Sequence, residues 1–92
     1  MEATIWELSG KVKSSKYRMK VLTNLSSGIK TPTEIKDETK LSMPHTSRAL
    51  AELNKWKLVQ CKNPASKKGK LYVLTNLGEK VLEILAKKNK NE

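Results

Sequence analysis

The sequence of 92 residues contains no phenylalanine, and aromatic residues make up only 4% of it. A surface of stacked aromatic rings, of the kind that binds single-stranded RNA or DNA, is therefore not expected. Cysteine occurs once, which excludes an intramolecular disulfide and a metal site built from clustered thiolates. We interpret this residue, Cys61, as a small hydrophobic side chain in a strand rather than as a redox sensor.

Long apolar runs are missing as well. No stretch approaches the roughly 18 to 20 apolar residues of a membrane-spanning helix, and no signal-peptide pattern opens the chain. The sequence has no paired carboxylates, no nucleophile next to a base and no glycine loop that could hold phosphates. We therefore expect a cytoplasmic protein that does not bind membranes, is not an enzyme, and uses no cofactor or metal. No small-molecule ligand can be identified from the sequence.

Acidic residues are scarce relative to basic ones, at 9 against 19, and the net charge is +10. This balance points to a polyanionic partner, and nucleic acid is the first candidate. The positive charge is unevenly spread, because residues 11–29 and 58–75 contain basic residues and no acidic ones, whereas residues 30–57 are nearly balanced. A merely solvated surface is the alternative interpretation of either basic run.

Apolar residues at helical spacing predict two helices in the first third of the chain. The first carries Ile5, Leu8 and Val12 on one side. The second, residues 16–25, follows a serine pair that can cap it, and Gly28 ends it. Its apolar stripe is expected to consist of Tyr17, Val21, Leu22 and Leu25.

Two further helices are predicted, with a turn of about three residues between them. Thr31, Pro32 and Glu34 form a helix start in which the threonine caps the helix and the glutamate completes a capping box. This third helix is short and ends near residue 39 or 40. Ser42 then caps the fourth helix, and Pro44 is tolerated in its first turn. This arrangement is typical of a helix-turn-helix, whose second helix enters the major groove of DNA.

The fourth helix, residues 42–55, is expected to have two opposite faces. Thr46, Leu50, Leu53 and Lys57 recur at steps of four and three residues. The side that they mark should face the protein interior as far as about Leu53 and Trp56. The outward face is centred on Pro44, Arg48, Ala51 and Lys55.

A β-hairpin and a last helix complete the expected fold. Residues 58–62 and 71–75 are rich in β-forming residues and enclose a lysine-rich segment, which predicts a hairpin with a basic tip. Thr75 can cap the last helix, residues 76–88. The fold class is therefore mostly α with a small β-hairpin, in the order α-α-α-α-β-β-α, as a single domain over residues 1–92.

The segment TPTEIKDETKLSMPHTSRALAELNKWKLVQCKNPASKKGKLYVLTNLGEKVLE resembles winged helix-turn-helix transcriptional regulators of the MarR and ArsR groups, particularly small archaeal members. The resemblance extends from about Ser15 to Ile84. It implies a sequence-specific regulator that binds double-stranded DNA. Residues 42–55 would be the recognition helix in the major groove, and residues 62–70 a basic wing on the backbone or the minor groove.

The resemblance also implies which residues contact DNA. Arg48 is the strongest candidate because its guanidinium can bond two acceptors on guanine, and an ion pair with Glu52 is the alternative. His45 is expected to make a polar or phosphate contact rather than to bind a metal or act as a base. The wing lysines can reach phosphate groups of the DNA backbone. The basic residues of the second helix could add further backbone contacts, and the alternative is that they only form a solvent-exposed helix face. The predicted DNA-binding residues are Lys16, Arg18, Ser42, Pro44, His45, Ser47, Arg48, Lys55, Lys67, Lys68 and Lys70.

One position departs from the family pattern. The recognition helix usually ends in a glycine before "LV", because that residue adopts a left-handed backbone, and here it is Lys57. Lysine adopts this conformation at a cost of about 1 kcal/mol. We expect either a strained turn or a slightly different helix end.

A single helix-turn-helix makes few base contacts, and two copies on a palindromic site would add to them. We therefore expect a homodimer through the terminal helices, residues 3–13 and 76–88. The spare apolar residues for this contact are Ile5, Trp6, Leu8 and Leu82. The alternative function is a winged-helix protein-interaction or RNA-associated module of the transcription or translation machinery.

Overall fold

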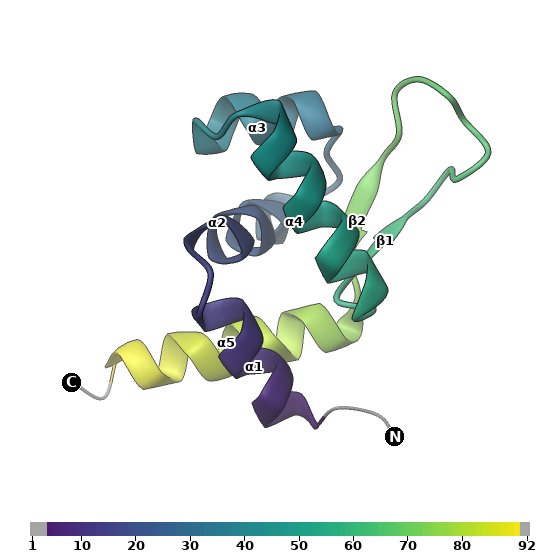
Figure 1. The fold of residues 1–92 in the computed structure, drawn as a ribbon. Helices are drawn as coiled ribbons and strands as arrows, with labels where there is room; N and C mark the ends of the chain where they lie inside the picture. The colour runs from purple at the N-terminus through teal and green to yellow at the C-terminus, as the bar shows by residue number, and fades with distance from the viewer. Residues whose placement is uncertain (1–3, 91–92) are drawn as a thin grey trace.

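The computed structural model describes residues 4–90, with side chains described as far as Lys87. Five α-helices, a short 3-10 helix and a two-stranded antiparallel sheet make up this part of the chain (Figure 1). The expected mostly helical fold and its element order are confirmed. Residue 3, the first of the predicted terminal helix, lies outside the described residues. The elements are α1 (Ile5–Lys13), α2 (Lys16–Asn24), η1 (Leu25–Ser27), α3 (Pro32–Thr39), α4 (Met43–Lys55), β1 (Val59–Cys61), β2 (Tyr72–Leu74) and α5 (Asn76–Lys90).

The helices begin where hydroxyl side chains accept hydrogen bonds from backbone N–H groups of the first turn. Ser15 caps α2, Ser42 caps α4, and Thr31 forms the predicted capping box with Glu34 at the start of α3. The Thr75 hydroxyl accepts a hydrogen bond of 3.0 Å from the Gly78 N–H at the start of α5. The structure confirms the predicted caps. They could be predicted because each contact is local and depends only on neighbouring residues.

The apolar core lies between the helices and the hairpin. Most of the residues predicted to face inward are buried, and one prediction is wrong: Tyr17 is 38% exposed. Leu8, expected as spare surface for a dimer, is 5% exposed and belongs to the core, and Leu82 is half-buried against it. The buried hydrophobic residues are Leu8, Val12, Val21, Leu22, Leu25, Ile35, Ala49, Leu50, Leu53, Leu58, Val59, Val81 and Leu85.

The hairpin is shorter than predicted and is fastened to the helical part. Its strands pair Val59 with Leu74 and Cys61 with Tyr72. Tyr72 also forms an isolated antiparallel bridge with Lys30, through backbone hydrogen bonds of 3.1 and 2.8 Å. The sequence gives no sign of this bridge because a single residue has no strand pattern. The bridge holds the loop-side end of β2 against the connection between η1 and α3.

The turn between α4 and β1 adopts the conformation that the family pattern requires. Lys57 has φ 63°, so the left-handed backbone is present although the residue is not glycine. The N–H of Leu58 donates to the carbonyl of Leu53 over 2.9 Å and closes the helix end. The Thr75 hydroxyl donates to the carbonyl of Lys57 over 2.7 Å, which joins the start of α5 to this turn.

Among the described residues, no helix combines the length and the apolar composition needed to cross a membrane.

Candidate nucleic-acid interface

The helix-turn-helix is formed by α3, a short turn and α4 (Figure 1). The turn is tight because Lys40 adopts a left-handed backbone with φ 64°, and Ser42 then starts α4. Thr46 is fully buried, and its hydroxyl donates to the carbonyl of Ser42 over 2.9 Å. Ala49, Leu50 and Leu53 continue the buried side of α4. The helix is thereby fixed in one rotation about its axis.

The opposite side of α4 is exposed, as its periodicity predicts. The structure brings the candidate DNA-contacting residues of this helix together on the exposed side, and it adds Met43, which is 37% exposed. This surface carries hydroxyl, imidazole, guanidinium and ammonium groups within one helix, which suits contacts to base edges and phosphates. Its predicted members are Ser42, Pro44, His45, Ser47, Arg48 and Lys55, all of them exposed.

Glu52 forms its ion pair with Arg18, not with Arg48. The Arg18 Nε lies 2.8 Å from Glu52 Oε1, and its Nη1 donates to the carbonyl of Lys11 over 2.7 Å. The hydrogen bond from Arg18 lowers the pKa of Glu52, and partial burial opposes that effect. The Arg48 side chain is exposed beside this pair.

Arg18 is engaged within the protein on a second side as well. Its guanidinium lies 4.9 Å from the ring centre of Trp56, and the Lys11 ammonium lies 5.1 Å from the same ring. These contacts join α1, α2 and the end of α4. Of the two predicted contacts on α2, Lys16 is exposed, whereas Arg18 is half-buried and has intramolecular partners.

An aromatic contact at the start of α4 was not expected from the sequence. The ring of Tyr17 in α2 stacks on that of His45, with 4.1 Å between the ring centres and 11° between the planes. The hydroxyl of Ser42 lies 3.0 Å from His45 Nδ1. Sequence reasoning missed Tyr17 because its spacing fits the apolar stripe of α2.

The side chain of Asn63 connects the two ends of the wing loop by hydrogen bonds. Oδ1 of the Asn63 side chain accepts a hydrogen bond of 2.7 Å from the Leu71 N–H, and Nδ2 of the same side chain donates to the Gly69 backbone carbonyl over 3.2 Å. Gly69 has φ 63°, a left-handed backbone that glycine adopts without a steric penalty. Asn63 was not singled out by the sequence, since an asparagine in a polar loop is unremarkable in composition.

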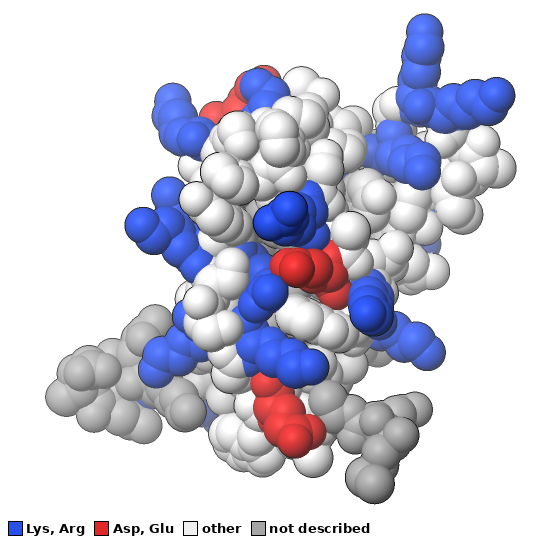
Figure 2. Space-filling model, in the orientation of Figure 1, with Lys and Arg blue, Asp and Glu red and all other residues white. Residues whose placement is uncertain are grey.

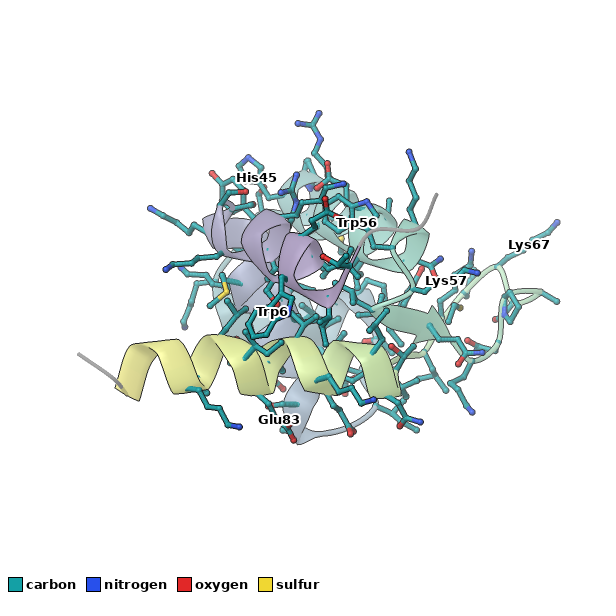
Figure 3. The ribbon with its side chains drawn as sticks, turned by 90° about the horizontal axis from the view of Figure 1, so that it is seen from below. Trp6, His45, Trp56, Lys57, Lys67 and Glu83 are labelled. Carbon is teal, nitrogen blue, oxygen red and sulfur yellow. The ribbon has the colours of Figure 1, made fainter. Side chains whose placement is uncertain are left out.

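The wing lysines differ in exposure. Lys67 and Lys68 are exposed, and Lys70 is half-buried. Lys67 lies at the far end of the loop, away from the helical body (Figure 3). The far end of the loop therefore places the Lys67 ammonium group in solvent, away from the helical body (Figure 3).

Basic side chains gather on the face of the molecule that carries α4 (Figure 2). Figure 2 shows lysine and arginine side chains over the face that carries α4 and at the tip of the wing. On α5, Glu79 and Glu83 are exposed together with Lys80 and Lys87, so the charges of these residues balance. Glu83 lies on the opposite side of the molecule from His45 (Figure 3). The face with α4 and the wing thus carries positive charge of the kind that attracts a polyanion (Figure 2).

The acidic residues of α3 are partly neutralised by bases. Glu38 Oε1 lies 2.9 Å from the Lys30 ammonium, and Asp37 Oδ1 lies 2.9 Å from that of Lys36. The pKa of Glu38 is lowered by the hydrogen bond from Asn24 first and by that from Lys30 second. These pairs reduce the negative charge that α3 would bring close to DNA.

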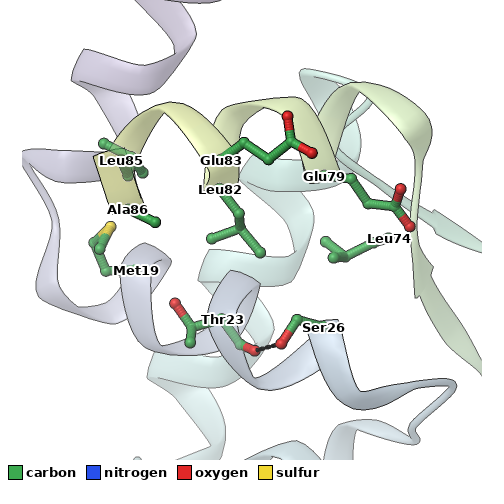
Figure 4. Close-up of a pocket in the computed structure, with 9 residues that line it drawn as sticks. All are labelled: Met19, Thr23, Ser26, Leu74, Glu79, Leu82, Glu83, Leu85 and Ala86. Carbon is green, nitrogen blue, oxygen red and sulfur yellow. Dashed lines mark hydrogen bonds between the residues drawn. The ribbon is translucent and has the colours of Figure 1, made fainter. Parts of the chain in front are cut away.

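A groove of about 560 Å³ opens between α2, η1, β2 and α5 (Figure 4). The sequence did not predict it, because its walls come from four separate elements. Its lining is mostly apolar and includes the side chains of Glu79 and Glu83. The groove is lined by Glu83, so it belongs to the side of the molecule opposite His45 (Figure 3). It is separate from the candidate nucleic-acid interface.

Comparisons with solved structures support the fold. TubR from Bacillus thuringiensis serovar israelensis, bound to 24 bp of tubC, is 17% identical with a TM-score of 0.81, and the match covers 96% of this chain and 98% of that chain. A MarR family transcriptional regulator from Silicibacter pomeroyi is 22% identical with a TM-score of 0.73, and the match covers 92% of this chain. This chain spans only 58% of that regulator's length.

A third similar structure is the homodimeric winged helix-turn-helix DNA-binding domain Mb0332 from Mycobacterium bovis. It is 22% identical with a TM-score of 0.67, and the match covers 89% of this chain and 72% of that chain. No curated protein matches the sequence. Among known families, the one described as winged helix-turn-helix matches residues 14–92. Since this match spans most of the sequence and the described residues form the helix-turn-helix and its wing, the chain belongs to the winged helix-turn-helix family.

Proposed function

We propose that this protein binds double-stranded DNA sequence-specifically and acts as a transcriptional regulator, with α4 in the major groove and the wing on the backbone or the minor groove. The observation that carries the proposal is the exposed polar side of α4, in which Arg48 is exposed and Glu52 is paired with Arg18 instead. A guanidinium in this position can bond two acceptors of a guanine. The DNA-bound TubR structure has the same fold and supports the assignment.

The two parts of the interface would contribute differently. Residues 42–55 include few charges, so α4 would supply discrimination among sequences through base edges. Lys67 and Lys68 on the wing, with Lys16 on α2, are exposed ammonium groups that would bind phosphate regardless of sequence. Arg18 would instead hold α1, α2 and α4 in place, because its guanidinium already bonds Glu52 and Lys11.

The test begins with selection of bound sequences from random duplex DNA. On the selected site, Arg48→Ala is expected to cost about 1–3 kcal/mol and to relax preference at one base pair. Lys68→Ala is expected to weaken all duplexes similarly and to reduce the slope of log affinity against log salt by about one. Lys80→Ala, an exposed lysine on α5, is the matched control and should change neither.

Two results would contradict the proposal. Equal losses for Arg48→Ala and Lys68→Ala on every duplex would mean that α4 does not discriminate among sequences. Co-purification with ribosomal RNA or with a polymerase, and no sequence selected from the random duplexes, would favour the RNA-associated or protein-interaction module.

We also propose that the protein acts as a homodimer through α1 and α5. Trp6 on α1 is 64% exposed, so a single chain leaves a large apolar area of this side chain in contact with water. The homodimeric Mb0332 domain supports this assembly. Light scattering at tens of micromolar should give the mass of two chains, and Trp6→Ala should lower it. A monomeric wild type at that concentration would overturn this part of the proposal.

Four further expectations stay predictions. They are that residues 1–92 form one domain, that the protein is cytoplasmic, that it acts by binding rather than by catalysis, and that it is of the archaeal type.

A further inference from the structure

The stacked pair of Tyr17 and His45 lies at the start of α4, within the interface proposed above. The two rings come from different helices, α2 and α4, and are nearly parallel at 11° with 4.1 Å between their centres. Both side chains are exposed to solvent. The core therefore does not explain the contact, because neither ring is buried in it.

A second contact involves a ring nitrogen of the imidazole. The hydroxyl of Ser42 accepts a hydrogen bond from the backbone N–H of His45 over 3.3 Å, and it lies 3.0 Å from the ring's Nδ1. Within the part of the chain whose side chains are described, the hydrogen bonds of the ring involve Nδ1 alone. Nε2 is thus the polar atom of the ring that remains available to a ligand.

These two contacts select one orientation of an exposed side chain. An exposed histidine without such contacts exchanges among rotamers, and binding through it must first restrict that motion. Here the stack fixes the plane of the ring, and the serine fixes which ring nitrogen, Nδ1, faces the hydroxyl of Ser42. The orientation exists before any DNA arrives.

We propose that Tyr17 is a positioning residue for DNA recognition, and that it holds His45 so that Nε2 contacts a base edge in the major groove. The inference rests on the proposed function, since it assigns one specificity contact within that interface. His45 lies in the first turn of α4, the part of a recognition helix that contacts base edges. Tyr17 acts through His45 and needs no DNA contact of its own.

The binding test compares Tyr17→Ala with Tyr17→Phe on the selected duplex. Tyr17→Ala removes the stack and is expected to weaken binding to that duplex about 2- to 10-fold, and unrelated duplexes less than about 2-fold. Tyr17→Phe keeps the ring and should bind like the wild type. His45→Ala should lose as much as Tyr17→Ala, and the double variant should lose no more than either, because both changes remove one contact.

Three binding results would overturn the inference. A Tyr17→Ala protein that binds like the wild type would show that the stack has no role. An equal loss on all duplexes would place the pair on phosphate rather than on a base. Additive losses in the double variant would show that the two residues act separately.

A second measurement reports on the stack without DNA. The chain has one histidine, so the imidazole resonances in an NMR spectrum need no assignment among several. The ring current of Tyr17 should shift the His45 signals upfield in the wild type and in Tyr17→Phe, and this shift should disappear in Tyr17→Ala. An unchanged spectrum in Tyr17→Ala would contradict the positioning role.

The two measurements separate this inference from the function on which it rests. A wild type that selects no duplex overturns the proposed function and the base contact together, whereas the histidine spectrum still decides whether Tyr17 positions the ring. Selective binding that is unaffected by Tyr17→Ala leaves the function standing and removes only the inference. Thermal melting of each variant controls for unfolding.

Discussion

Gly78, in the first turn of α5, lies directly against the backbone of the turn that follows α4. A Cβ atom placed there would lie 2.2 Å from the carbonyl oxygen of Leu58. That oxygen cannot move freely, because it accepts a hydrogen bond of 3.1 Å from the Thr75 N–H. The neighbouring Lys57 carbonyl is held by the Thr75 hydroxyl over 2.7 Å. Gly78→Ala therefore forces α5 away from the turn after α4.

The expected size of the effect follows from two opposing contributions. Overpacking of this kind costs about 1–3 kcal/mol and sometimes more, and here the obstacle is backbone rather than a flexible side chain. Alanine is favoured over glycine in a helix by about 1 kcal/mol, which offsets part of the cost. Because a contact of 2.2 Å with backbone puts the overpacking cost at the top of this range or above it, we expect Gly78→Ala to lower the free energy of unfolding by about 1–3 kcal/mol after the offset. The melting temperature should fall by roughly 5–20 °C.

The matched control is Gly10→Ala in α1, because a Cβ at Gly10 would meet nothing within 4 Å. This substitution should raise the free energy of unfolding by about 0.5–1 kcal/mol, from helix propensity alone. Urea denaturation, followed by circular dichroism at one fixed protein concentration, compares the two. If Gly78→Ala stabilises the protein as Gly10→Ala does, then α5 does not press on the Leu58 carbonyl and the reasoning is wrong.

Two further substitutions test local features of the fold. Lys57→Gly should raise the free energy of unfolding by about 0.5–1 kcal/mol, because φ is 63° at this residue. Lys55→Gly, at the last residue of α4, should lower the free energy of unfolding, because glycine disfavours the helix. Equal effects of the two substitutions would contradict the reasoning. Arg18→Ala should lower stability at pH 7. The pKa of Glu52 is lowered from 4.5 in the folded state, so the pair stabilises fully above pH 4.5 and this contribution is lost as the pH falls through the folded pKa. The side chains are 21% and 36% exposed, so the pH-dependent part is only about 0.5 kcal/mol. Urea titrations at pH 7 and pH 3 should show a smaller effect of Arg18→Ala at pH 3, and an equal effect would refute it.

The helix starts could be predicted from the sequence because the interactions that form them are short-range. The capping box of Thr31 and Glu34 joins residues three apart, and the Ser42 cap of α4 does the same. Periodicity likewise separated the buried Thr46 and Leu50 from the exposed Arg48 on α4. The exposed face of the candidate recognition helix was therefore predictable.

The pairing of side chains across elements was not predictable in the same way. Glu52 had a candidate partner one turn away in Arg48, but the structure pairs it with Arg18 from α2. Tyr17 fitted an apolar stripe, yet it stacks on His45 at the start of α4. In each case the partner lies more than 25 residues away in the sequence, and only the packing of α2 against α4 brings the groups together.

Sequence alone thus determined the element order, the caps, the exposed face of α4 and the basic tip of the wing, since these depend on composition and on contacts within one or two turns. Tertiary structure decided which charged groups remain available to DNA. Packing engages Arg18 with Glu52 and Trp56, keeps Arg48 exposed and sets the plane of the His45 ring. Such contacts depend on distance and orientation between elements, and no local pattern in a sequence encodes them.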